Sequence, residues 1–368
     1  ARELYTMLLN ALEAPEPMQA AVYRFADTLL TRYGNNDIVQ ENLEFLRTRR
    51  NHAIRALKDS GQWDSIQQAD QRPMVVVNPA AADGETVFAT VAEAVDAAEE
   101  GGLVEVVGGT YTENLEIFDK TDVVIRPRKG DWVVLQGAPD KPAVSTLYAR
   151  GCKRLVVRDI VITGPGFLVN IENSDGCTLE SCWIVNSRRP KEEAGVEFRR
   201  SQGCRLVNCI VQGFTRGMNI ERSRICLVRG NLFLNTPHAA VEIIGSAQCK
   251  ILGNVIQDTN AAWLTDAANY KANTIDQNVY RNAKHILKDL VKVYARTLEE
   301  ARNIGGTKND MQSADNVVVR FKEPEKGDYR IVNPGDISRA TGLNTPRGPR
   351  WNDVRWWLAT KHAPVAKD

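Results

Sequence analysis

Two short stretches, CTLESCWIVN (177–186) and CRLVNCIVQG (204–213), decide the fold of this 368-residue chain. Each contains C-x-L-x-x-C, a spacing that can indicate a metal site or a disulfide. Their first cysteines belong to a column of similar positions spaced 22, 27, 22 and 23 residues apart: Leu155, Cys177, Cys204, Cys226 and Cys249. The chain therefore repeats itself between residues 150 and about 282.

The other positions of the repeat form columns of their own. The positions two residues further on are all apolar: Val157, Leu179, Leu206, Val228 and Ile251. A column of residues that tolerate a left-handed turn follows: Asp159, Ser181, Asn208, Gly230 and Gly253. Two further columns complete the unit: Ile160, Cys182, Cys209, Asn231 and Asn254, and then Ile162, Ile184, Val211, Phe233 and Ile256. A unit of strand, one-residue corner and strand, repeated about every 22–27 residues, predicts a mainly β protein with a parallel β-helix.

This fold explains the cysteines without a metal or a disulfide. Coils of a β-helix stack about 4.8 Å apart, so equivalent residues form ladders, and cysteine fills an inward position as a small hydrophobe. Zinc needs four ligands that converge tetrahedrally, whereas stacked side chains are parallel. Disulfides between coils fit the distance but not the Cβ directions. Seven cysteines are also an odd number, so we predict free thiols.

Composition excludes some partners. The net charge is +1 and 25% of residues are charged, so no overall field favours nucleic acid or anionic lipid. No apolar run of about 18 residues predicts a transmembrane helix, and ARELYTMLLN lacks the features of a signal peptide. Because the chain begins at Ala1 rather than Met, an export signal removed earlier stays compatible with the sequence, and the compartment stays open.

The sequence divides into three expected parts. Residues 1–72 keep helical spacing and form an α-helical region, whose charged side is either solvated or contacts another protein or a second subunit. Residues 73–282 form the β-helix, which begins with a helix capped by Thr90 and Glu93. Residues 283–368 form a C-terminal capping segment and an extended tail. In that segment we expect a helix at TLEEARN and strands at NVVVRF and KGDYRI. The tryptophans of the tail either pack on the coils, the favoured reading, or stack on sugar rings.

The strand before each corner carries polar residues between its inward ones. The first outward row is Tyr148, Asn170, Glu197, Asn219 and Glu242, and the second is Arg150, Glu172, Arg199, Glu221 and Ile244. Neighbouring carboxylates raise one another's pKa or bind a cation, and calcium prefers such carboxylate and amide oxygens. The adjoining loop adds three cations that suit anionic sugars: Arg188, Arg189 and Lys191. His238 is expected near the same edge, either as a proton-transfer group or as a plain loop histidine.

Two stretches resemble a known family. DGETVFATVAEAVDAAEEGGLVEVVGGTYTENLEI (83–117) is similar to the opening of pectin methylesterases and many bacterial β-helix proteins, where a helix caps the first coil. The stretch beginning TLEEARNIGG resembles the closing segment of bacterial β-helix proteins that act on polysaccharides. Residues 73–337 therefore resemble the pectate-lyase-like superfamily. The resemblance implies a right-handed parallel β-helix, a polysaccharide partner and an exported or cell-surface location.

The activity motifs of that superfamily match poorly. Gln257, Asp258 and Thr259 resemble the Q-D-T of pectin methylesterases, whose aspartate is the acid, but the second aspartate has no counterpart in DQNVYRN. RGPRW (347–351) only loosely resembles the family's arginine motif. The aspartate cluster with G-H-G of polygalacturonases and the W-I-D-H of pectate lyases are absent. In lyases of the superfamily calcium acidifies the α-proton and an Arg or Lys removes it, which would make Arg199 the base.

The sequence thus predicts a polysaccharide-binding β-helix protein, with lyase or hydrolase action on an acidic polymer left open. The candidate catalytic residues are Glu197, Arg199, Glu221 and Glu242, with calcium as a possible cofactor. The candidate substrate contacts are Tyr148, Asn170, Arg188, Arg189, Lys191, Asn219 and His238. In the alternative, the rows are a ladder of compensating charges on a non-catalytic interaction module attached to the helical region.

Overall fold

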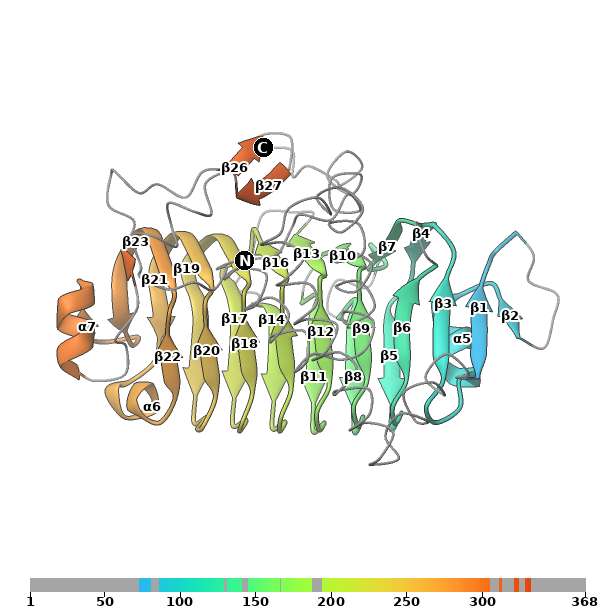
Figure 1. Cartoon of the computed structure of the whole chain (residues 1–368), viewed down its shortest axis with the longest axis horizontal. Helices are drawn as coiled ribbons and strands as arrows, with labels where there is room; N and C mark the ends of the chain where they lie inside the picture. The colour runs from blue at the N-terminus through green and yellow to red at the C-terminus, as the bar shows by residue number, and fades with distance from the viewer. Residues whose placement is uncertain are drawn as a thin grey trace, which may run out of the picture. The chain divides into compact units, whose positions relative to one another are not determined.

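Figure 1 shows the structure, a computed structural model. It describes residues 73–80, 86–128, 131–140, 145–165, 167–186 and 194–304, and the backbone of 311–312, 321–323 and 328–331. The chain divides into two units, 1–72 and 73–368, and every described residue belongs to the second. The predicted N-terminal helices, the loop cations Arg188, Arg189 and Lys191, and the C-terminal tail lie outside the described residues.

The described part is a right-handed parallel solenoid of about seven turns. The repeat predicted the parallel β-helix, and the resemblance implied its right-handedness. Each coil runs along three faces, called here the first, second and third sheets in the order in which a coil visits them; the long strands of the last coils join the first and third into one 15-stranded sheet. The first sheet contains β5 (Leu115–Phe118), β8 (Leu147–Arg150), β11 (Val169–Glu172), β14 (Ala194–Arg199), β17 (Arg216–Glu221) and the second halves of β19 (Leu232–Ile244), β21 (Val255–Leu264) and β23 (Val279–Lys288).

The other two sheets complete each coil. The second sheet contains β2 (Val87–Phe88), β1 (Met74–Val77), β3 (Leu103–Val106), β6 (Val124–Pro127), β9 (Val156–Arg158), β12 (Thr178–Glu180), β15 (Arg205–Val207), β18 (Leu227–Arg229), β20 (Lys250–Leu252) and β22 (Thr274–Asp276). The third contains β4 (Gly109–Thr112), β7 (Val133–Gln136), β10 (Val161–Gly164), β13 (Trp183–Asn186), β16 (Ile210–Gln212) and the first halves of β19, β21 and β23. Parallel pairing continues past residue 282, to Lys288.

The one-residue corners between the second and third sheets are confirmed. Asp159, Ser181 and Asn208 have φ values of 60°, 53° and 57°, and Gly230 and Gly253 have 65° and 63°. Only this left-handed conformation turns the chain so sharply in one residue, and it is costly for most side chains. Asn, Asp, Ser and Gly therefore fill five of these corners, and Gln277 holds the next one with a φ of 64°.

In the column that contains Cys182 and Cys209, the later coils have asparagines, which form a hydrogen-bonded ladder. The buried Asn254 Nδ2 donates to the Val228 carbonyl at 3.0 Å and to Asn278 Oδ1 at 2.9 Å. Its Oδ1 accepts from the backbone N–H of Asn231 at 2.9 Å and from Asn231 Nδ2 at 3.0 Å. Serines form a similar buried ladder at the opposite corner: Ser174, Ser201, Ser223 and Ser246. These ladders satisfy backbone groups at the turns.

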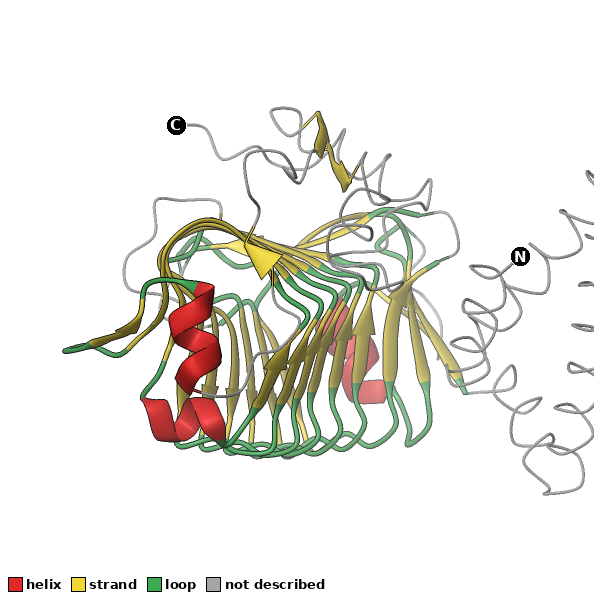
Figure 2. Cartoon of the chain, turned by 60° about the vertical axis from the view of Figure 1, so that its left-hand side comes forward, coloured by secondary structure: helices red, strands yellow, loops and turns green. Residues whose placement is uncertain are grey.

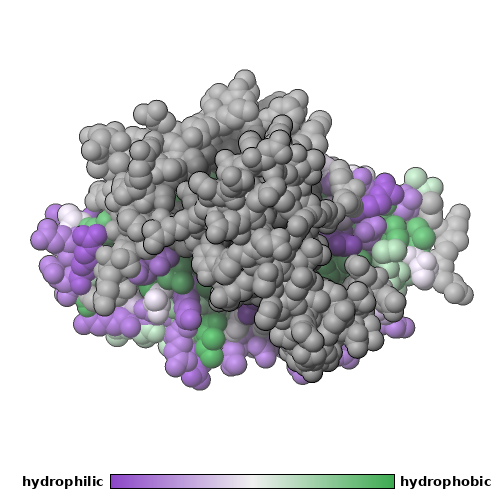
Figure 3. All heavy atoms as spheres, in the orientation of Figure 1, coloured by the Kyte–Doolittle hydropathy of each residue, from purple (hydrophilic) through white to green (hydrophobic). Residues whose placement is uncertain are grey.

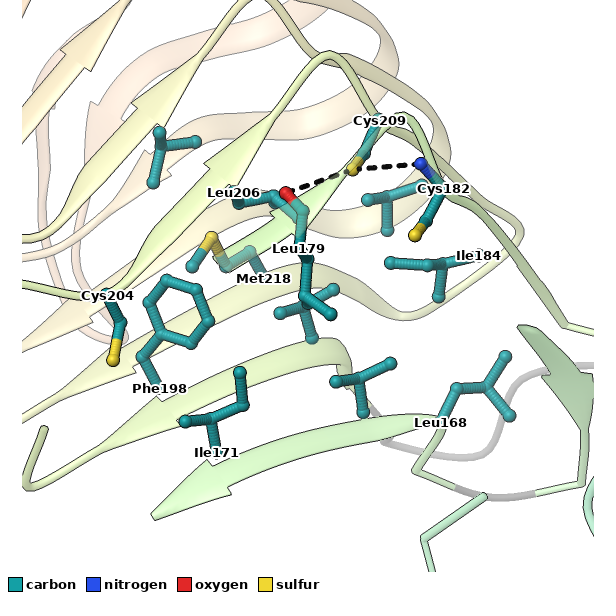
Figure 4. Packing of buried hydrophobic residues seen from close by; sticks show 14 of the residues in the cluster. Leu168, Ile171, Leu179, Cys182, Ile184, Phe198, Cys204, Leu206, Cys209 and Met218 are labelled. Atoms are coloured by element: carbon teal, nitrogen blue, oxygen red, sulfur yellow. Dashed lines mark hydrogen bonds between the residues drawn. The ribbon is translucent and has the colours of Figure 1, made fainter. Parts of the chain in front are cut away.

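All seven cysteines are buried and free, which confirms the prediction made from the repeat. Figure 4 shows Cys209 between two neighbours of the adjacent coil: its Sγ accepts from the Cys182 N–H at 3.4 Å and donates to the Leu179 carbonyl at 3.6 Å. Burial raises the pKa of the Cys152 thiol to about 11 and raises that of Cys209 as well. The thiols therefore act as core side chains.

Thiol titration gives a direct test of this core. We expect the native protein to react hardly at all with a thiol reagent at pH 8, because all seven sulfurs are buried. In denaturant all seven cysteines should react. Fewer than six reactive thiols after denaturation without reductant would contradict the free-thiol core.

Each end of the solenoid carries helices (Figures 1 and 2). At the start, α5 (Val91–Ala97) has the predicted capping box of Thr90 and Glu93. The Glu113 carboxylate, from the next coil, accepts from the backbone N–H groups of Val91 and Ala92 at 3.0 Å each. Glu113, in the GTYTE part (109–113) of the stretch that resembles pectin methylesterases, thus fastens α5 to the first coils.

The far end is closed by short elements. They are α6 (Ala267–Lys271), β24 (Val293–Ala295), which is antiparallel to β23, and α7 (Leu298–Ile304), with Thr297 capping α7 as predicted. β25 (Met311–Gln312) returns parallel to β23, and β26 (Phe321–Glu323) pairs with β27 (Asp328–Ile331). Within the described ranges, no helix has the length and apolar character needed to cross a membrane.

Candidate functional site

The two predicted outward rows exist and are in register. Parallel pairing joins Tyr148 to Asn170, Asn170 to Glu197, Glu197 to Asn219 and Asn219 to Glu242. The second row runs alongside through Arg150, Glu172, Arg199, Glu221 and Ile244. Each step spans one coil, or about 4.8 Å. A continuous polar surface therefore follows the solenoid axis on the first sheet.

Glu197 and Asn219 form the centre of the first row. Asn219 Nδ2 donates to Glu197 Oε1 at 2.9 Å, which fixes the orientation of the amide. Asn219 is only 7% exposed, and its Oδ1 is buried without a hydrogen-bond partner. Burial raises the pKa of Glu197 above its ordinary value, although the Asn219 hydrogen bond and Arg199 oppose the shift. The centre of the row thus holds a carboxyl with a raised pKa next to a buried acceptor, Asn219 Oδ1, that has no hydrogen-bond partner.

Glu242 is the next carboxyl of that row, two coils from Glu197. It is 7% exposed, and its Oε2 lies 3.3 Å from Arg216 Nε. Burial raises its pKa despite Arg216, and the charges of Glu197 and Glu221 add to the shift. Since these side chains point away from the core, such burial is unusual for a surface charge ladder.

The second row contains paired charges. Arg199 Nε lies 3.6 Å from Glu221 Oε2, and Arg222 Nε lies 3.8 Å from Glu221 Oε1. Arg199 is therefore a cation beside the carboxyls of both rows, held by Glu221. The planar cation suits the binding of an anion, and the predicted role of Arg199 as a base stays a prediction.

Tyr148 and Asn170 extend the surface toward the N-terminal coils. The Tyr148 hydroxyl donates to Glu172 Oε2 at 2.7 Å, and its ring meets Phe118 edge-on, with centroids 6.0 Å apart. Burial and the Glu172 carboxylate raise the pKa of Tyr148. Asn170 Oδ1 is buried without a partner. An aromatic ring and a second unused acceptor therefore lie in line with Glu197.

Charged corners flank the second row. Arg200 and Arg222 have φ values of 50° and 47°, the left-handed conformation that most side chains avoid. Arg200 Nη1 lies 3.9 Å from Glu172 Oε1. These corners join the first and second sheets at the lower edge of Figure 1, and the described atoms along that edge are mainly hydrophilic in Figure 3. The strained arginines thus bring positive charge to one side of the rows.

Arg216 is the residue that the sequence did not reveal. The first predicted outward row contains Glu197 and Asn219, but β14 and β17 begin three residues before them, at Ala194 and Arg216. Ala194 pairs with Arg216, and Arg216 with Ala239, so a third outward row precedes the other two. The sequence does contain a signal for this row, in the pairs AG (194–195), RG (216–217) and AA (239–240). The second residue of each pair is small and buried, so the first is an additional outward position.

The remaining predicted residues are placed as follows. His238 lies half-buried in β19, at the register irregularity between Thr236 and Ala239, four residues before Glu242. Asp258 of the Q-D-T stretch lies in β21, where it accepts from Gln257 Nε2 and Asn282 Nδ2 at 2.9 and 2.8 Å. It is on the third-sheet part of that strand rather than among the outward rows.

Metal binding has no preformed cluster in the described part. There, no group of three or more His, Cys, Asp and Glu side chains is arranged to hold a metal ion. The carboxylates of the rows are instead separated by Asn219 and by arginines. Calcium therefore stays a prediction, to be tested together with a bound polymer.

Comparison with known proteins matches the geometry at the level of fold. The model of a family described as the right-handed β-helix region matches residues 145–317. A search of curated protein sequences finds no match.

Several solved structures are similar in fold at low identity. The alginate lyase from Paenibacillus sp. str. FPU-7 is 13% identical, with a TM-score of 0.46, over 60% of this chain and 92% of that one. The pectin methylesterase from Aspergillus niger is 13% identical, with a TM-score of 0.39, over 68% and 90%. Pectate lyase Pel9A is 12% identical, with a TM-score of 0.38, over 66% and 80%. The repeat, the stacked coils and the matched segment together show that the described part of this chain has the right-handed parallel β-helix fold.

Proposed function

We propose that the outward rows of the first sheet bind a polysaccharide and that the central carboxyls cleave it. The observation that carries this proposal is the burial of Asn219 and Glu242, both 7% exposed, on the outward side of the sheet. Asn219 Oδ1 has no partner there, and a buried acceptor without a partner is costly unless a ligand uses it. A sugar hydroxyl is a suitable donor.

The shape and chemistry of the rows favour a linear polymer. Polar groups recur at every coil, so a chain of sugar residues along the axis meets similar contacts at each step. Tyr148 supplies a ring for the apolar face of a sugar. Arg199 and Arg216 are planar cations suited to carboxylates, which favours a uronate polymer over a neutral one.

Glu197 and Glu221 have different environments, as an acid and a base require. Burial raises the pKa of Glu197, whereas Glu221 is ion-paired with Arg199 and Arg222. In hydrolysis Glu197 gives its proton to the glycosidic oxygen and the C–O bond breaks. Glu221 takes a proton from water, and the water oxygen bonds to the anomeric carbon. Elimination with Arg199 as the base is the competing chemistry.

A panel of polymers tests the proposal. Purified full-length chain is incubated with uronate and neutral polysaccharides, with and without calcium, and binding is measured by affinity electrophoresis. Hydrolysis releases reducing ends only, whereas elimination also gives an unsaturated product that absorbs in the ultraviolet. The absence of both binding and turnover across the panel would end the polysaccharide proposal.

Glu197→Gln is expected to lower turnover by about 10²–10⁴-fold, the usual contribution of a general acid or base, while binding is retained. Glu116→Gln is the matched control, because Glu116 occupies the same outward row, three coils before Glu197, and is exposed. Its turnover should equal that of the unaltered chain. Equal losses in the two variants would show that the row acts only through its overall charge.

The ion pairs of Glu221 and Glu242 favour a second reading, in which the rows are a structural charge ladder. The pH dependence of the free energy of unfolding separates this reading from the proposed catalytic site. Because the folded-state pKa of Glu197 is raised, its contribution to stability is full below the unfolded pKa and is lost as pH rises through the folded pKa. Glutamine stays neutral, so Glu197→Gln should not lower stability at pH 7. A clear loss there would favour the non-catalytic interaction module.

A further inference from the structure

The outward side of the third sheet carries an apolar row that the candidate site does not use. Its members follow one another through the strand pairing, one per coil: Val134, Val161, Trp183, Ile210, Leu232, Val255 and Val279. They form a hydrophobic cluster separate from the main core. Their inward neighbours, such as Ile162 and Phe233, belong to the main core instead. Along this row the third sheet is therefore apolar on both sides.

Every member of this row is buried, with at most 7% exposure. Among the described residues, the cluster contains only side chains of the third sheet itself and the partly buried Trp132. A sheet that faces water on one side alternates apolar and polar residues, whereas a sheet apolar on both sides lies between two layers. The outward row therefore needs a covering layer from another part of the protein.

We propose that the C-terminal segment 332–368 of the same chain packs along this row. β25 brings the chain back to the end of the row, because Met311 pairs in parallel with Val279, its last member. From there the sequence continues to Asp368. The segment follows β26 and β27, so it begins about 20 residues after the chain leaves this sheet.

Length and composition fit this occupant. Seven coils span about 29 Å at about 4.8 Å per coil, a distance that roughly nine extended residues cover. The stretch WNDVRWWL (351–358) supplies five large apolar side chains: Trp351, Val354, Trp356, Trp357 and Leu358. Such a concentration of apolar surface is costly in water and pairs naturally with an apolar row.

Polar atoms beside the row also lack partners. Trp132 Nε1 and Gln257 Oε1 are buried without a hydrogen bond. The backbone of a segment laid along the row carries both donors and acceptors. An irregular chain segment therefore suits this surface better than a second apolar sheet face, whose side chains would leave these atoms unsatisfied.

Photo-crosslinking in the full-length chain tests the proposal. p-Benzoylphenylalanine replaces Ile210 in the row or, as a control, Thr178, which lies on the outward side of the second sheet. After irradiation, peptides from the first variant should be joined to 332–368 of the same chain, and those from the control should not. Crosslinks to residues 1–72, crosslinks to a second chain, or none at all would overturn the proposal.

A second measurement covers the case in which the bulky replacement disturbs folding. In Trp356→Ser/Trp357→Ser, binding of a hydrophobic dye should rise several-fold as the row becomes accessible, with the far-UV circular dichroism unchanged. Trp63→Ser is the matched control and should bind dye like the unaltered chain. A rise in the control alone would assign the cover to the N-terminal region and reject the C-terminal segment.

Discussion

Asn254→Asp is expected to destabilise the solenoid by about 3–5 kcal/mol at pH 7, the usual cost of an uncompensated buried charge. The asparagine is fully buried and donates to two acceptors, the Val228 carbonyl and Asn278 Oδ1. A carboxylate cannot donate to either, so three oxygens would face one another without protons. Denaturant unfolding measures the loss in the free energy of unfolding, provided that its dependence on denaturant concentration has the same slope in the variant and the unaltered chain.

The loss should depend on pH in a defined direction. A buried aspartate has a raised folded-state pKa, so the variant regains stability as pH falls through that value, because the neutral acid can donate one hydrogen bond. Asn235→Asp is the matched control: Asn235 is exposed, and its φ of 52° suits aspartate equally well. If both variants lost the same free energy, the buried ladder would not be a source of stability.

Gly217→Ala is expected to cost about 1–3 kcal/mol and to weaken polysaccharide binding. A Cβ at this position would lie 2.6 Å from the Ala240 carbonyl oxygen and 2.7 Å from Phe233 Cδ1. The carbonyl belongs to the next coil, so the backbone has to move. The preceding residue, Arg216, would move with it and lose its position beside Glu242.

Gly109→Ala controls for the change of residue type. Gly109 lies in β4 and is exposed, and its added Cβ would meet nothing closer than 3.6 Å. Its stability should change little, and the outward rows should be unaffected. If Gly217→Ala were as mild as Gly109→Ala, the two neighbouring coils would not approach as closely as the structure shows.

The fold could be predicted because one repeat constrains many residues at once. Asp159 and Asn208 are separated by two coils, yet both adopt the left-handed corner that their column required. The outward register of Glu197 and Asn219 followed from the same alternation. Periodicity of this kind states which positions stack and which face they share, and it depends little on the identity of any one side chain.

The rest of the site depends on contacts that periodicity does not encode. Arg216 was missed because it precedes a glycine at a bend, where alternation breaks and the chain has an additional outward position. Asn254 was placed in a column with small core residues, but its role comes from hydrogen bonds to the coils on either side. The burial of Glu242 depends on what lies above the sheet, which a repeat cannot specify.

The closed ends of the solenoid have a consequence for its size. A stack of like coils could continue by recruiting the same edge of another molecule, which is how fibrils grow. Here α5, held by Glu113, finishes one end, and antiparallel β24 with α7 finishes the other. Within the described part, the number of repeats therefore sets the length of the outward rows, and gain or loss of an internal coil would alter that length one rung at a time.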